Sequence, residues 1–201
     1  MTKAEFAERL KNACQTVISA EGQLTEIDSR FGDADHGITM SRIAGAIQGA
    51  AEESQGGIKS MLDDAAMAVM MINGGSAVTL WNTWLDGLQE AAPEGTEMSL
   101  EEIKAMFAHA CQSLSALSRA KIGDKTMMDA LIPASEAIAA AAGTEAELFA
   151  AAAEAAAKGA ENSRNFVSRF GRARSYGEAT IGTPDAGAVS MSCFFAGLAK
   201  E

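Results

Sequence analysis

Three aspartates, one histidine and two glycines fall within ten consecutive residues of the sequence, Asp28-Ser-Arg-Phe-Gly-Asp33-Ala-Asp35-His36-Gly37. Carboxylates this close repel one another unless protons or a metal ion neutralise their charge. Oxygen ligands of this kind suit Mg²⁺ or Ca²⁺ rather than Zn²⁺. We therefore predict that this segment, called the acidic loop below, binds a hard divalent cation.

The acidic loop lies between two segments with helical spacing, one ending at Ile27 and the other beginning at Ile38. Residues 37–39 therefore fall at a helix N-terminus, where free N–H groups and the helix dipole favour an anion. A cation site directly beside an anion site suits a metal-chelated phosphate. Our interpretation is that the loop forms part of a nucleotide site.

The acidic loop has two simpler explanations. The spacing is equally consistent with a turn in which Asp35 only caps the following helix. An EF-hand is excluded, because its twelve-residue loop must close on a glutamate. A loop opening at Asp33 would reach Ala44, and one opening at Asp28 would reach Thr39.

Composition limits the class of protein. The 201 residues, 48% of them apolar, predict one domain spanning residues 1–201 with a sizeable core. A net charge of −11 argues against nucleic-acid binding, which needs a basic surface.

Cys14, Cys111 and Cys193 are far apart, as is typical of reduced thiols. The sequence has no signal segment and no run of about 18 apolar residues, so we expect a cytoplasmic protein without a membrane span.

Apolar residues recur at three- and four-residue steps along most of the sequence, and no long segment alternates at period two. Capping boxes, in which Ser or Thr precedes Glu by three residues, mark three helix starts. We therefore expect an all-α fold of eight antiparallel helices, as a bundle or closed barrel with the glycine loops at one end. The predicted helices cover about residues 3–27, 38–51, 58–72, 76–91, 100–117, 127–138, 145–166 and 188–198.

Three other loops end at predicted helix starts. Their last residues are Ser76-Ala77 after two glycines, Thr126-Met127 after Gly-Asp-Lys, and Asp185-Ala186-Gly187 after Gly-Thr-Pro. Each loop alone is explained by helix capping, with Thr126 or Asp185 as the cap and Lys125 as a solvated surface charge. Together with the acidic loop, they favour a shared site at which backbone N–H groups contact phosphate.

Basic residues are concentrated in one short segment. Four of the sixteen lysines and arginines, Arg164, Arg169, Arg172 and Arg174, fall within eleven positions. Local positive charge in an acidic protein favours a site for a polyanion. The alternative is that these arginines pair with nearby glutamates such as Glu161.

In order and spacing, these motifs resemble the nucleotide-binding L subunit of dihydroxyacetone kinase and the corresponding domain of the ATP-dependent dihydroxyacetone kinases. The resemblance covers nearly the whole sequence. The motifs that carry it are Asp28 with Gly32-Asp33-Ala34-Asp35-His36-Gly37, Gly123-Asp124-Lys125-Thr126-Met127-Met128-Asp129-Ala130, Gly171-Arg172-Ala173, and Ile181-Gly182 with Asp185-Ala186-Gly187-Ala188.

The resemblance implies a barrel of eight antiparallel amphipathic helices with ADP or ATP at one rim. It also implies that Asp28, Asp33 and Asp35 hold two Mg²⁺ ions that chelate the phosphates, and that these aspartates and His36 form the catalytic group. The residues it implies at the nucleotide are His36, Gly37, Ile38, Thr39, Ser76, Ala77, Thr126, Met127, Arg172, Asp185, Ala186 and Gly187.

In that family, a K-type subunit holds the ketone on a histidine, and the L subunit delivers the phosphoryl group. The donor is ATP, or ADP rephosphorylated in place by a phosphocarrier protein of the sugar phosphotransferase system. We therefore expect a stand-alone subunit that phosphorylates dihydroxyacetone or a related short ketose held by a K-type partner. The alternative is a nucleotide-loaded regulatory or binding module. It is favoured by Ser76-Ala77-Val78, where the family usually has a Ser-Gly turn.

Overall fold

The computed structural model describes residues 1–200, and helices dominate that part of the chain. The α-helices are α1 (Lys3–Ser19), α2 (Glu21–Ser29), α3 (His36–Glu53), α4 (Ile58–Met70), α5 (Ser76–Glu90), α6 (Leu100–Ser118), α7 (Met128–Ala140), α8 (Glu145–Asn162) and α9 (Ala186–Leu198). Two 3₁₀ segments, η1 (Ser163–Asn165) and η2 (Arg172–Thr180), lie between α8 and α9. Within residues 1–200 there is no β-strand, so the predicted all-α fold class is confirmed.

Local sequence sets several of the helix starts. The three predicted capping boxes form at the N-termini of α1, α6 and α8. In each, a Ser or Thr hydroxyl accepts from the third helical N–H, and the glutamate accepts from the N–H of the cap. The Asp185 side chain caps α9 by accepting from the Ala188 N–H at 2.8 Å.

The first helix differs from expectation, because it is divided at Ala20 into α1 and α2 instead of running unbroken to Ile27. Residues 1–200 thus hold nine α-helices where eight were expected. The Ser19 hydroxyl donates to the Gln15 carbonyl at 2.8 Å, one turn earlier. Side-chain bonds of this kind compete with the backbone ladder and bend helices. The break lets α2 contact both α3 and α9.

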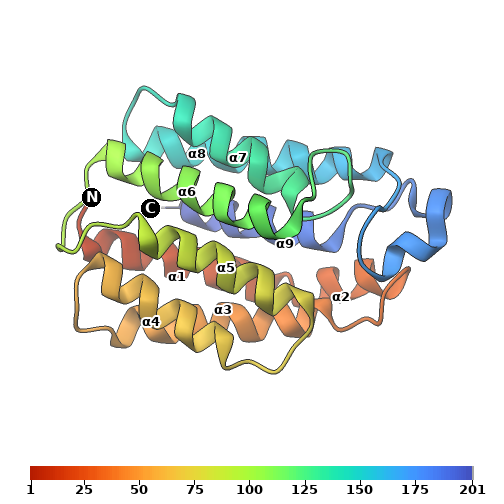
Figure 1. Cartoon of the computed structure of the whole chain (residues 1–201), viewed down its shortest axis with the longest axis horizontal. Helices are drawn as coiled ribbons and strands as arrows, with labels where there is room; N and C mark the ends of the chain where they lie inside the picture. The colour runs from red at the N-terminus through yellow and green to blue at the C-terminus, as the bar shows by residue number, and fades with distance from the viewer. Residues whose placement is uncertain (201) are drawn as a thin grey trace.

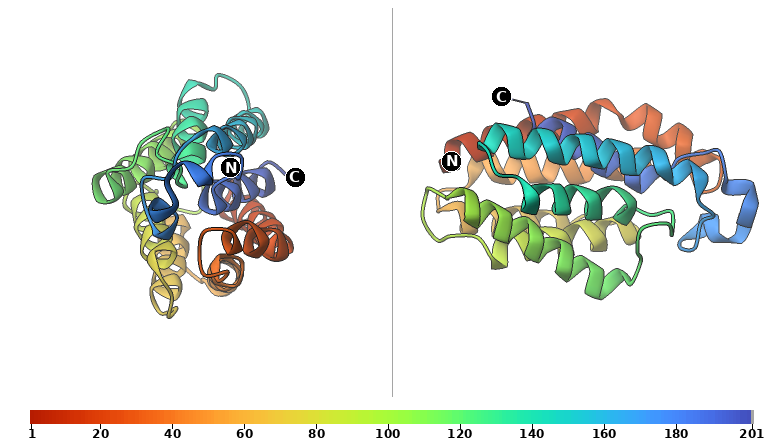
Figure 2. Two further views of the ribbon diagram at one scale, coloured as in Figure 1. Left: turned by 90° about the vertical axis from the view of Figure 1, so that its right-hand side faces the viewer. Right: turned by 90° about the horizontal axis from the view of Figure 1, so that it is seen from above.

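The other eight helices pack in a ring. In the order α1, α3, α4, α5, α6, α7, α8 and α9, each contacts the next, and α9 contacts α1. Successive helices in this order run in opposite directions, and both termini lie at the same end of the molecule (Figure 1). The view along the helices shows them arranged around a common centre (Figure 2). The connections that carry the acidic loop and η2 lie at the end opposite the termini.

Aromatic side chains fill the centre of the ring. Trp81 and Trp84 of α5 contact Phe194 of α9, with ring centroids 5.2 and 5.4 Å apart. Phe107 of α6 lies against Trp84 and Phe149. Each of these side chains is at most 2% exposed. The helices that bear the loops of the candidate site are therefore fixed by one continuous core.

No helix within residues 1–200 combines the length and apolar character needed to cross a bilayer.

Candidate functional site

A cavity of about 530 Å³ opens at the end of the ring where the acidic loop lies. This volume is within the usual range for a small-molecule site. Its walls come from the acidic loop, the start of α5, the connection between α6 and α7, the start of η2 and residues 183–187. The start of η2 and residues 183–187 belong to the same connection, between α8 and α9. Four connections far apart in the sequence therefore meet around one cavity.

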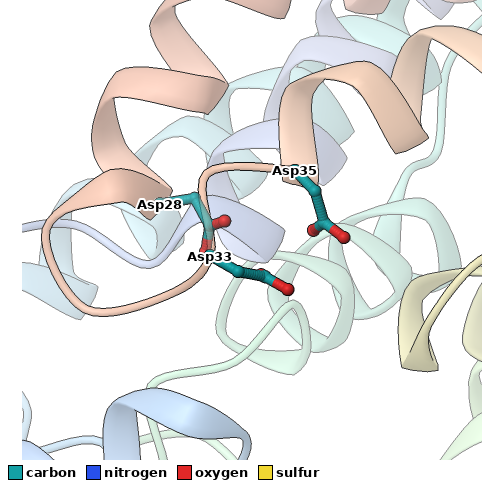
Figure 3. A group of neighbouring side chains, drawn as sticks. All are labelled: Asp28, Asp33 and Asp35. Atoms are coloured by element: carbon teal, nitrogen blue, oxygen red, sulfur yellow. The ribbon is translucent and has the colours of Figure 1, made fainter.

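The three aspartates of the acidic loop converge at this cavity. Each of Asp28, Asp33 and Asp35 offers a carboxylate oxygen within 4.8 Å of the others. They come from the last turn of α2, the following loop and the residue before α3 (Figure 3). A Cβ on Gly32 would overlap Oδ1 of Asp28, so glycine allows the loop to fold over that carboxylate.

The environment of the aspartates fits a divalent cation. Asp35 precedes α3 but makes no side-chain capping bond, so its carboxylate remains available. Partial desolvation, followed by the charge of Asp33 and a side-chain hydrogen bond with it, raises the pKa of Asp35. Asp33 and Asp35 are exposed, which leaves room for water or phosphate oxygens beside the carboxylates. Hard oxygen donors with open positions are the set that Mg²⁺ uses with phosphates.

An arginine partly neutralises the aspartates. Nη2 of Arg172 lies 2.7 Å from Oδ2 of Asp33, and both residues line the cavity. The Arg172 side chain is otherwise 72% exposed. A guanidinium suits a polyphosphate as well as a carboxylate, because its N–H groups match both in geometry.

His36 joins the starts of α3 and α9. Its Nε2 lies 3.2 Å from the Ser190 hydroxyl, which donates to the Gly187 carbonyl at 2.9 Å. Burial lowers the pKa of His36, although the charge of Asp28 opposes this effect. The partly buried ring lines the cavity and is tied to α9 through Ser190. Ser190 was not predicted, because a serine inside an apolar helix gives no sequence signal.

Most of the predicted nucleotide contacts line the cavity. These are His36, Thr39, Ser76, Ala77, Thr126, Met127, Arg172, Asp185, Ala186 and Gly187. Gly37 and Ile38 do not line it. A Cβ on Gly37 would overlap the Glu21 carbonyl and the Thr25 side chain, so this glycine serves the contact between α2 and α3. Ile38 is 45% exposed outside the cavity.

The start of α5 offers backbone donors to the cavity. Gly75 precedes the helix and makes no side-chain capping bond, and Ser76 and Ala77 follow as its first residues. Their N–H groups belong to the first turn, where no carbonyl within the helix can accept them. The small residues here leave room for an anion to approach these groups.

Lys125 is buried, against the alternative that it is a solvated surface charge. It is 4% exposed, and its Nζ donates to the carbonyls of Ser163 at 2.7 Å and Thr183 at 2.6 Å. Burial lowers the pKa of Lys125, although the charges of Asp185 and Asp129 oppose the shift. The ammonium thus ties the loop before α7 to the end of α8 and to the segment before α9.

Asp129 fixes the same loop from the other side. Its carboxylate accepts from the Gly123 N–H at 2.6 Å and from the Thr126 N–H at 2.7 Å. Burial raises the pKa of Asp129, and these backbone bonds limit the increase. Thr126 and Met127 are therefore held at the cavity by a buried carboxylate and a buried ammonium.

The four arginines between residues 164 and 174 have different surroundings in the structure. Among them, Arg172 lines the cavity. Arg164 pairs with Glu161 at 2.8 Å and donates to the Gly182 carbonyl, as the pairing alternative expected. Arg169 and Arg174 are exposed and do not line the cavity, although their sequence neighbours Phe170 and Ala173 do. Apolar side chains that were not predicted complete the wall, among them Ile27, Phe31, Leu80, Trp81 and Phe170.

The sequence is similar to a known protein family and to characterised relatives. The family model described as the DAK2 domain matches residues 30–200. An L-erythrulose kinase of Pectobacterium atrosepticum is 34% identical over 188 residues, which are 90% of this chain and 32% of that protein. The ADP-binding subunit DhaL of the PEP-dependent dihydroxyacetone kinase of Escherichia coli is 28% identical over 183 residues, which are 89% and 87% of the two chains.

The same fold occurs in a solved structure. The dihydroxyacetone kinase from C. freundii, in complex with AMP-PNP and Mg²⁺, matches 98% of this chain with a TM-score of 0.76. The match covers 33% of that enzyme, and the sequence identity is 23%. This chain thus spans about a third of the length of the kinases it matches, but most of the length of the ADP-binding subunit.

Proposed function

The chain belongs to the DAK2 domain family, and we propose that it is the nucleotide-binding subunit of a kinase that acts on dihydroxyacetone or a related short ketose. The convergence of Asp28, Asp33 and Asp35 on one cavity is the observation that carries this proposal. The names of the relatives support both acceptors, since they include dihydroxyacetone kinases and erythrulose kinases. Residues 1–201 act as one domain in this proposal.

In this proposal, the three aspartates would hold two Mg²⁺ ions. Bound Mg²⁺ would neutralise part of the phosphate charge. The start of α5 donates backbone N–H groups to phosphate oxygens, and Arg172 leaves Asp33 to pair with the polyphosphate. The base and sugar lie against the apolar wall that includes Trp81 and Met127. Phosphoryl transfer needs mainly positioning and charge stabilisation, which these groups supply.

In the transfer step, the bond between the terminal phosphorus and its bridging oxygen breaks, and ADP leaves. A new bond forms between that phosphorus and the hydroxyl oxygen of the ketose. The proton of the hydroxyl passes to a base on the partner or to water. In this proposal a K-type subunit holds the ketose, and ATP or a phosphocarrier protein of the sugar phosphotransferase system supplies the phosphoryl group.

The test combines the purified chain with the K-type subunit of the same organism. Dihydroxyacetone and erythrulose are offered as acceptors, with ATP or with the phosphocarrier system as donor, and the sugar phosphate is followed by ³¹P NMR. We expect product only when both subunits are present. Product from the chain alone would contradict the division between subunits. Binding of MgADP without transfer to either acceptor would identify a regulatory module instead.

A further inference from the structure

Positive charge is concentrated beside the cavity mouth. Residues 117–125 and 161–185 hold seven of the sixteen lysines and arginines but only four of the 27 acidic residues. These two segments meet, because the Arg169 N–H donates to the Asp124 carbonyl at 3.1 Å and both segments line the cavity. These two segments thus hold three more basic than acidic residues in a protein with a net charge of −11, and they lie at the same end as the acidic loop.

Four of these basic residues have no role in the cavity. Arg119, Lys121, Arg169 and Arg174, called the basic rim below, are all exposed, and none of them lines the cavity. Within residues 1–200 none lies in a salt bridge, whereas Arg164 and Arg172 each pair with a carboxylate. Neither nucleotide binding nor internal pairing accounts for the basic rim.

Large apolar side chains are exposed in the same segments as the basic rim. Leu117, Ile122, Phe170, Tyr176 and Ile181 are between 39% and 53% exposed. They lie in the last turn of α6, in the α6–α7 connection and in the segment around η2, which occupy the same end of the molecule (Figure 1). Exposed aromatic and aliphatic side chains among arginines are typical of protein interfaces.

The charges indicate what covers this surface. A nucleic acid would meet the apolar side chains and, beyond the rim, the strongly acidic remainder of the chain. A protein face with carboxylates around an apolar centre matches both features. In the proposed function, the ketose must reach a phosphate at the cavity mouth, so the subunit that presents it must lie across this end.

We propose that the basic rim and the exposed apolar side chains of the same segments dock an acidic face of the subunit that presents the ketose. This inference rests on the proposed function and adds to it the surface and the charge of the partner. The rim steers the partner over the cavity, because opposite charges accelerate encounter and set the orientation of docking. In the complex, the three arginines and the lysine of the basic rim form ion pairs with carboxylates of the partner.

The test measures binding separately from transfer. The dissociation constant of the MgADP-loaded chain for the K-type subunit of the same organism is measured by calorimetry between about 0.05 and 0.3 M salt, where screening changes strongly. The variant carries Arg119→Glu, Lys121→Glu, Arg169→Glu and Arg174→Glu. The control carries Lys59→Glu and Lys104→Glu, which lie in the first two turns of α4 and α6 at the opposite end. Binding of MgADP to each chain alone is the check on the cavity.

We expect about a tenfold or larger rise in the dissociation constant for the rim variant, and a flatter salt dependence, because charges at an interface rim act through screened attraction. MgADP binding and the control should match the wild type. Equal partner affinity in the rim variant, or no binding of the wild type to the subunit, overturns the docking surface. Tight binding of duplex DNA in its place would assign the rim to nucleic acid. Loss of transfer with docking intact would instead count against the proposed function.

Discussion

The guanidinium of Arg172 lies 2.7 Å from the carboxylate of Asp33 and joins η2 to the acidic loop. A second contact links the acidic loop and η2, because the rings of Phe31 and Tyr176 meet edge to face with centroids 5.2 Å apart. An internal cation therefore offsets part of the charge that three neighbouring carboxylates create. Binding of Mg²⁺ by those carboxylates would release Arg172 for the phosphates.

Replacement of Asp33 tests whether this residue acts as a metal ligand or has a structural role. Asp33→Asn should abolish Mg²⁺-dependent binding of ADP in calorimetry, because one of three converging ligands loses its charge. Thermal unfolding of the apo chain should change little, since an exposed ion pair is worth about 0–1 kcal/mol and carboxylate repulsion falls. Asp64→Asn on the exposed face of α4 is the control. A strongly destabilised apo variant would show that Asp33 is structural.

Two glycines of α3 provide a matched pair. Gly37→Ala should lower the free energy of unfolding by about 1–3 kcal/mol, because its Cβ would overlap the Glu21 backbone. Gly45→Ala should raise it by about 0.5–1 kcal/mol, since nothing lies within 4 Å and alanine favours the helix. Chemical denaturation of both variants measures the difference. Equal effects would contradict the close packing of α2 on Gly37.

Lys125 should be needed for the shape of the cavity. Lys125→Met leaves the carbonyls of Ser163 and Thr183 without their buried donor, which should cost about 2 kcal/mol or more of stability. ADP affinity should also fall, because the segment before α9 is no longer tied to the loop before α7. Lys121→Met, at an exposed position nearby, should leave both quantities near wild type. Unchanged stability in the Lys125 variant would show that the ammonium is dispensable.

Stability of the apo chain should depend on pH through Asp185. Burial, with a smaller contribution from the charge of Asp129, raises the pKa of Asp185 to about 7, although the Ala188 N–H and Lys125 oppose the shift. The unfolded chain releases this proton near pH 4, so the native state loses stability as pH rises from about 4 to about 7. Above pH 7 the loss is constant.

Asp185→Asn removes that titration and keeps an oxygen for the α9 cap. Relative to wild type, it should therefore gain stability between about pH 4 and pH 7, by on the order of 1–4 kcal/mol. Urea denaturation at a series of pH values measures the gain. Glu154→Gln on the exposed face of α8 provides the reference. A gain that does not vary with pH would contradict the burial of an ionisable Asp185.

Features encoded by nearby residues could be predicted from the sequence. The capping boxes at Thr2, Ser99 and Thr144 form as expected, because each depends on residues three apart. The aspartates of the acidic loop lie close together for a similar reason, since only eight positions separate the first from His36. Helix starts bearing glycine loops were expected to share one site, and the cavity is lined by four of them.

Features that depend on tertiary contacts could not be predicted. Lys125 is polar in sequence, and only the carbonyls of Ser163 and Thr183, from segments 38 and 58 residues away, explain its burial. Gly37 was assigned to the nucleotide from its motif, but the structure gives it a packing role against Glu21. The contact between His36 and Ser190 joins residues 154 positions apart, beyond the reach of any local pattern.

The central claim is that Asp28, Asp33 and Asp35 hold the divalent cations of a bound nucleotide. The most direct measurement is a crystal structure of the chain with ADP and Mn²⁺, with the ions located by their anomalous scattering. We predict peaks at about 2.0–2.3 Å from oxygens of the three carboxylates and of the nucleotide phosphates. Nucleotide bound with no peak at these carboxylates, or peaks at another part of the chain, would contradict the account.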